Sequence, residues 1–142
     1  VWILLLLAFA GIADAWYLTA SALSNTALSC DLGAALDGCN IVAKSPYSHF
    51  LGIPLALYGV GFYAVTFVLA ALLLVLHDRF LTRALYVLSI AGALASLVFL
   101  AIQFVLIKAL CVYCIGSAGI SFLIFFVLQD LWRKTKSNVP SV

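Results

Sequence analysis

The chain has 142 residues, of which 67% are hydrophobic and 8% are charged, whereas soluble domains are about 45–50% apolar and about 25% charged. This composition excludes an ordinary soluble domain and predicts a single membrane domain over residues 1–142 that works within a lipid bilayer. The formal net charge of +2, without a run of basic residues, excludes nucleic acid as a partner.

The first predicted membrane span covers about residues 1–22 and opens with VWILLLLAFAGIADAW. The stretch lacks a basic n-region and a clear cleavage site, so we expect it to be a retained helix and not a removed signal peptide. Asp14 falls near the outer end of this helix, where a carboxylate is costly unless it has a partner. We favour a hydrogen-bonding role for Asp14 over proton transfer.

A polar segment over residues 23–49 follows and carries two cysteines, Cys30 and Cys39. It is the one sizeable segment expected outside the membrane. His49 closes this loop, and we interpret it as an exposed interfacial histidine in preference to a proton shuttle.

Three further apolar stretches predict helices over residues 50–76, 84–107 and 109–131, followed by a tail over 132–142. The boundary at Lys108 is argued from length. A single helix from residue 84 to residue 129 would reach about 69 Å, over twice the bilayer core of roughly 30 Å. None of the stretches alternates like a barrel strand. The predicted fold is therefore an all-α membrane protein with four transmembrane helices.

The cations predict the orientation. Five of the seven lie in the second loop or the tail, namely Arg79, Arg83, Arg133, Lys134 and Lys136, and the other two are Lys44 and Lys108. Because cytoplasmic segments are enriched in Lys and Arg, we expect the C-terminus in the cytoplasm and the first loop outside it. All four cysteines then lie on the oxidising side of a bacterial inner membrane or its archaeal equivalent.

The sequence CVYC opens the fourth predicted helix with Cys111 and Cys114. Residues three apart share a helix face, and the unpaired N–H groups of a helix start favour a thiolate. The alternative is a structural role, in which the two thiols are packed in the helix and unreactive. Zinc is disfavoured because Cys30 and Cys39 are widely spaced and no histidine adjoins either pair. A c-type haem is excluded because Ile115 occupies the fifth position.

The two cysteine pairs favour a relay. A loop dithiol beside a dithiol in the membrane passes two electrons from a soluble protein into the bilayer by disulfide exchange. A lipid-soluble acceptor is then needed, for which quinone is the common choice. The deeper cysteine, Cys114, is expected to adjoin it, with no metal involved.

Five motifs stand in an order that resembles a prokaryotic member of the vitamin K epoxide reductase family over essentially the whole chain. They are ADAWYLT, CDLG, Cys39 with Ser45, FLGIPLALYG and CVYC. The order differs from that of the disulfide bond formation protein B type, in which the C-x-x-C pair comes first.

The resemblance implies a role for each cysteine. Cys30 would take electrons from a thioredoxin-like periplasmic partner, Cys39 would pass them on through a transient disulfide with Cys111, and Cys114 would reduce the quinone. The quinone-binding positions would be Ser45, Ser48, Leu51, Gln103, Ile107 and Ser117.

One residue departs from the family pattern. Vertebrate members carry a tyrosine where this chain has Ala118, so we expect reduction of ubiquinone or menaquinone and not of vitamin K epoxide. The predicted function is a quinone-dependent thiol-disulfide oxidoreductase that drives disulfide formation. The alternative is a non-catalytic scaffold or small transporter whose loop is closed by a Cys30–Cys39 disulfide.

Overall fold

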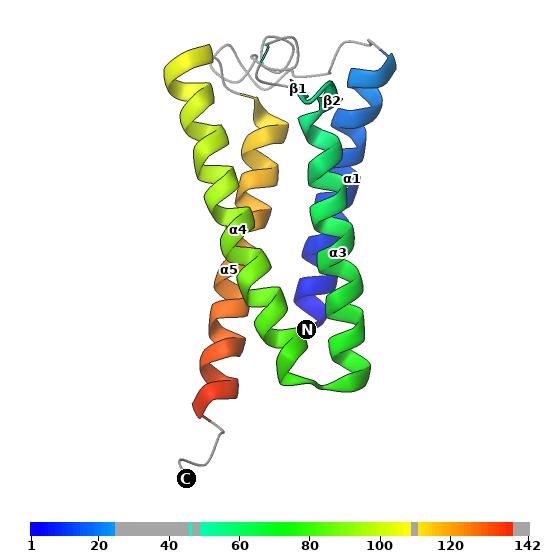
Figure 1. Cartoon of the computed structure of the whole chain (residues 1–142), viewed down its shortest axis with the longest axis vertical. Helices are drawn as coiled ribbons and strands as arrows, with labels where there is room; N and C mark the ends of the chain where they lie inside the picture. The colour runs from blue at the N-terminus through cyan, green and yellow to red at the C-terminus, as the bar shows by residue number, and fades with distance from the viewer. Residues whose placement is uncertain (25–45, 47–48, 109–110, 138–142) are drawn as a thin grey trace.

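The computed structural model describes residues 1–24, 46, 49–108 and 111–137. Within these residues four long helices run up and down in turn (Figure 1): α1 (Trp2–Ser24), α3 (Leu55–Leu76), α4 (Arg79–Ile102) and α5 (Val112–Ser137). A π-helical turn, η2 (Gln103–Ile107), prolongs α4. All four spans are long and apolar enough to cross a membrane. The predicted four-helix membrane fold is confirmed.

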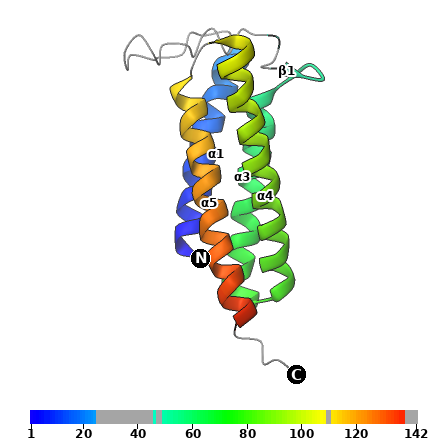
Figure 2. The same cartoon turned by 90° about the vertical axis from the view of Figure 1, so that its left-hand side faces the viewer.

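The bundle is held by two extensive helix pairs. α1 packs along α3 and also contacts α5, and α4 packs along α5, while the contact between α3 and α4 is smaller. Figures 1 and 2 show these four helices nearly side by side along the long axis. Large buried side chains from all four helices fill the centre: Leu4, Tyr63, Leu85, Ile124 and Leu128.

The turn between α3 and α4 consists of His77 and Asp78, which cap the two helices. His77 takes the left-handed conformation (φ 50°), and its N–H donates to the Leu73 carbonyl, as in a common helix C-terminus. Asp78 accepts a hydrogen bond from the Phe80 N–H at 3.0 Å and caps α4. Helix α4 therefore begins at Arg79, five residues before the predicted start at residue 84.

Helix α5 also extends past its predicted end at residue 131 and reaches Ser137. Lys134 and Lys136 lie in its last turn, where cations interact favourably with the helix dipole. An exposed ion pair between Lys134 and Asp130, 3.1 Å long, joins adjacent turns. Polar residues thus continue the helix beyond its apolar stretch.

A small hairpin precedes α3. Strand β1 (His49–Phe50) pairs antiparallel with β2 (Ile53–Pro54), and the turn residues Leu51 and Gly52 have φ angles of 55° and 77°, as in a type I′ turn. The second span was predicted to begin at residue 50, but α3 begins at Leu55, directly after Pro54.

A substitution at Gly11 can test the packing between α1 and α3. A Cβ placed on Gly11 would collide with the Tyr63 ring, and overpacking of this kind costs about 1–3 kcal/mol. We expect Gly11→Ala to lower the thermal unfolding temperature of the detergent-solubilised protein. The matched control is Gly61→Ala on α3, where a Cβ would meet nothing within 4 Å. Equal unfolding temperatures for the two variants would contradict this view of the interface.

Candidate redox site

Cys111 forms the N-terminal cap of α5. Its carbonyl accepts the N–H of Ile115 at 2.9 Å, the first hydrogen bond of the helix. Its Sγ accepts the N–H of Cys114 at 3.4 Å, the place that a capping side-chain oxygen usually takes. Cys111 is 1% exposed, whereas Cys114 is half-buried, and neither forms a disulfide in this structure. The C-x-x-C pair therefore begins the helix, as predicted.

Gln103 links the end of one helix to the start of the next. Its carbonyl accepts the N–H of Lys108, which has a left-handed φ of 55° and ends η2. Its Oε1 accepts the N–H of Cys111 at 3.3 Å, which is otherwise an unpaired donor at a helix start. The Gln103 side chain is fully buried, and leaving such a donor unpaired would cost about 1–3 kcal/mol. The chain thus reverses at Lys108, as the length argument predicted.

The surroundings of Cys111 favour its thiolate. A hydrogen bond from the Cys114 thiol lowers the pKa of Cys111, burial opposes this shift, and the N–H groups of Cys114 and Tyr113 lower the pKa further. The positive end of the α5 dipole acts in the same sense. The lowered pKa of Cys111 is typical of a reactive thiol.

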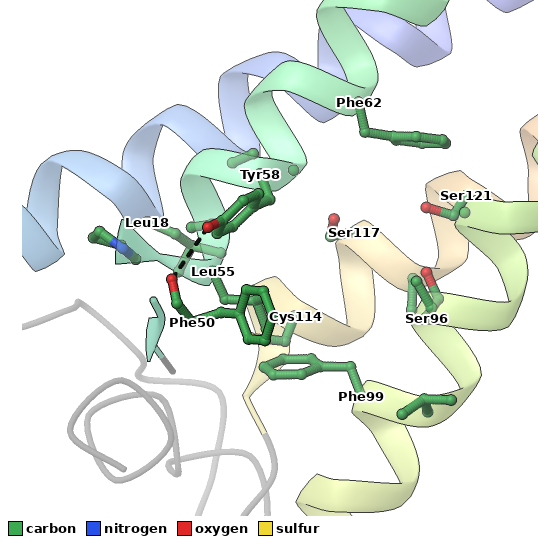
Figure 3. Close-up of a pocket in the computed structure, with 18 of the residues that line it drawn as sticks. Leu18, Phe50, Leu55, Tyr58, Phe62, Ser96, Phe99, Cys114, Ser117 and Ser121 are labelled. Carbon is green, nitrogen blue, oxygen red and sulfur yellow. Dashed lines mark hydrogen bonds between the residues drawn. The ribbon is translucent and has the colours of Figure 1, made fainter. Parts of the chain in front are cut away.

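A pocket of about 800 Å³ opens beside the pair, within the range of pockets that hold small molecules and cofactors. Figure 3 shows side chains from four helices around it. The lining includes Leu18 on α1, Tyr58 and Phe62 on α3, Ser96 and Phe99 on α4, and Cys114, Ser117 and Ser121 on α5. The wall is mostly apolar and aromatic, and both cysteines belong to it.

Polar groups line one part of this wall. The Tyr63 hydroxyl donates to the Ser117 carbonyl at 2.7 Å and lies 2.9 Å from the hydroxyls of Ser117 and Ser121. These serines follow Cys114 along one face of α5. Asp14 on α1 interacts electrostatically with Tyr63 and with both cysteines, and its Oδ2 is buried without a hydrogen-bond partner among the described residues. The pocket therefore offers hydroxyl groups beside a sulfur.

The predicted site residues fall in several places. Cys30, Cys39, Ser45 and Ser48 lie outside the described residues. Ser117 lines the pocket, Ile107 packs against Cys111, and Gln103 contacts the backbone of Cys111. Leu51 lies at the hairpin turn with 82% of its surface exposed and is not among the residues that line the pocket.

Several pocket residues were not predicted. Ser121 lies seven residues after Cys114, so its place on the same helix face could have been found from spacing alone. Phe62, Tyr63 and Phe99 belong to other helices, and their approach to Cys114 depends on how the bundle packs. Among the described residues, no cluster of three or more His, Cys, Asp or Glu side chains could hold a metal ion.

Comparison with known families adds an independent observation. The Vitamin K epoxide reductase family matches residues 2–128, which include both cysteine pairs and all the pocket residues named above. A search of curated proteins finds no significant match.

The acidity of Cys111 can be measured in a Cys30→Ala, Cys39→Ala background. Since the Cys114 hydrogen bond and the helix N–H groups lower the pKa of Cys111, its alkylation should reach half-maximal rate below the ordinary thiol pKa of about 8.5. Cys114→Ala removes the hydrogen bond that lowers the pKa of Cys111 most and should shift the midpoint upward. Quantifying the alkylated Cys111 peptide by mass spectrometry across pH gives both profiles. Coincident profiles would contradict the role given to Cys114.

Proposed function

Since the chain belongs to the vitamin K epoxide reductase family, a family of membrane oxidoreductases, we propose that it is a quinone-dependent thiol-disulfide oxidoreductase. It takes two electrons from a reduced thioredoxin-like protein and passes them to a quinone, which drives disulfide formation. The observation that carries the proposal is the position of the C-x-x-C pair: Cys111 caps a membrane helix, and Cys114 faces an apolar pocket of about 800 Å³.

The electron path uses the cysteines in the order that the family resemblance implies. The partner reduces Cys30 and Cys39, and the Cys39 thiolate then attacks Cys111, so that the Cys111–Cys114 bond breaks and a transient Cys39–Cys111 disulfide forms. Cys30 attacks Cys39 in turn, which closes a Cys30–Cys39 disulfide and releases reduced Cys111. Once Cys111 and Cys114 are both reduced, they close a disulfide and transfer two electrons and two protons to the quinone, which leaves as quinol. The low pKa of Cys111 suits its part in disulfide exchange.

The pocket suits a flat, apolar substrate with two carbonyl oxygens. Phe50, Phe62 and Phe99 supply aromatic surface, and Ser117 and Ser121 of α5 add hydroxyl groups to the lining. Tyr63 positions both serines through its hydrogen bonds. Such a wall, apolar with a few placed polar groups, is typical of small-molecule sites.

Ala118 bears on which substrate is used. It is buried at the pocket wall, at the position where the resemblance places a tyrosine in vertebrate members. Its methyl group donates no hydrogen bond to an epoxide or carbonyl oxygen. We therefore propose ubiquinone or menaquinone as the substrate in preference to vitamin K epoxide.

The charge distribution supports the orientation. The α3–α4 turn and the end of α5 lie at one end of the bundle, and the start of α5 lies at the other (Figure 1). Arg79, Arg83, Arg133, Lys134 and Lys136 belong to the first end, and Lys108 to the second. By the positive-inside rule, the end with the cysteine pair faces the periplasm or exterior of a bacterial inner membrane or its archaeal equivalent.

Anaerobic quinone reduction tests the function. The purified protein, supplied with a reduced thioredoxin-like protein and an analogue of ubiquinone or menaquinone, should form quinol. The rate should fall to the uncatalysed background in Cys114→Ala, because the dithiol can no longer close a disulfide. Absorbance of the quinone reports turnover, and the unfolding temperature shows that the variant is folded. Turnover that survives in Cys114→Ala, or a folded wild type inactive with several donors, would favour the scaffold alternative.

The pocket can be tested separately by adding bulk. Ser96 lines it from α4, so Ser96→Phe should raise the KM for quinone by about tenfold, which corresponds to about 1.4 kcal/mol of binding free energy. The matched control is Leu97→Phe, because the neighbouring Leu97 is exposed on the surface of the bundle and does not belong to the lining. Equal KM values in steady-state assays of the two variants would place quinone binding elsewhere.

A further inference from the structure

The side chain of Gln103 has two ends with different environments. Its Oε1 accepts the N–H of Cys111 at 3.3 Å. The whole side chain is buried, but its Nε2 has no hydrogen-bond partner among the described residues. Buried amide groups are normally hydrogen-bonded at both ends. A buried donor without a partner therefore points to an acceptor that forms at another stage of the reaction.

Cys114 supplies an acceptor of this kind. Gln103 binds the Cys111 backbone, and the Cys111 sulfur accepts the Cys114 N–H. Cys114 therefore lies next to the residue that this amide holds, and its thiol interacts with the Gln103 side chain. A neutral thiol is a weak acceptor, whereas hydrogen bonds to a charged acceptor are shorter and stronger. The amide would thus have little to bind while Cys114 is protonated or joined in a disulfide, and a strong partner once the sulfur carries negative charge.

That charge arises in the relay proposed above, on which this inference rests. When the Cys39 thiolate attacks Cys111, a Cys39–Cys111 bond forms and the Cys111–Cys114 bond breaks. The electron pair of the broken bond goes to the Cys114 sulfur, so the negative charge moves from Cys39 to Cys114 and no outside oxidant or reductant is needed. The leaving group is the sulfur beside the unpaired amide.

We propose that Gln103 is a positioning residue of the redox pair, which holds the Cys111 backbone through Oε1 and stabilises the departing Cys114 thiolate through Nε2. The two bonds come from one planar amide, so holding Cys111 also aims the donor at Cys114. This role differs from contact with the quinone. Gln103 is not among the residues that line the pocket.

A Cys30→Ala background isolates the step. Without Cys30, the Cys39–Cys111 disulfide cannot be resolved within the chain, and it equilibrates with Cys111–Cys114. Alkylation followed by mass spectrometry of the linked peptides gives the ratio of the two disulfides. Gln103→Met has nearly the same shape without the amide, and we expect it to lower the Cys39–Cys111 share by about tenfold, the scale of a hydrogen bond to a charged group.

The matched control is Ser89→Ala, which removes another buried polar group of α4 whose hydrogen bond, to the Tyr86 carbonyl, is local. It should leave the ratio unchanged. The Cys111 N–H is present in both disulfide forms, so losing its bond to Oε1 largely cancels in the ratio. Should Gln103→Met fail to fold, Gln103→Asn makes the same comparison, because it keeps the amide but withdraws it by one methylene.

Three outcomes distinguish the positioning role of Gln103 from the cysteine relay on which it rests. A lower Cys39–Cys111 share in Gln103→Met, together with a lower kcat and an unchanged KM for quinone in the otherwise native chain, supports the inference. An unchanged ratio, or a raised KM alone, would overturn it and leave the relay standing. Absence of the Cys39–Cys111 disulfide when Gln103 is intact would overturn the relay and this inference with it.

Discussion

The reversal of the chain between α4 and α5 is the constraint on which the site depends. Backbone donors in an apolar surrounding must be satisfied within the protein, and a helix that starts there presents several unpaired N–H groups. The chain meets this need with a π-helical turn, a left-handed Lys108 and the Gln103 amide on the Cys111 N–H. The same contacts that end one span and start the next therefore hold the redox pair.

An asymmetry between the two sulfurs follows from this arrangement. The Cys111 backbone is held by Gln103, and its sulfur accepts the Cys114 N–H, which helps to lower the pKa of Cys111. Cys114, one turn into α5, is joined along the helix face by Ser117 and Ser121. Both cysteines line the pocket, but Cys111 belongs to the turn between the two helices, and Cys114 to the helix face that carries the serine hydroxyls. Different surroundings for the two thiols are compatible with the oxidoreductase chemistry of the family.

Much of the fold could be predicted because lipid imposes length and composition. Four apolar stretches, and a stretch too long for one span, were enough to predict four helices and the turn at Lys108. The helix ends were less predictable, since charged residues were taken as the ends of spans. In the structure the ends are determined by caps and prolines: Asp78 starts α4 ahead of Arg79, and Pro54 precedes α3. Arg79, Lys134 and Lys136 lie within helices, so a charged residue does not mark the end of a helix.

The site was predictable in part, for a related reason. The C-x-x-C spacing and Ser117 share a face of one helix, so periodicity alone places them together. Membrane helices are apolar all round, however, and the sequence of α3 does not distinguish the side that bears Phe62 from the side that faces lipid. Gln103 was predictable only in part. An amide within an apolar span signals function, yet its partner is a backbone N–H eight residues later. That partner is brought within reach only when the chain turns back at Lys108, which is why the sequence alone does not predict the hydrogen bond between Gln103 and Cys111.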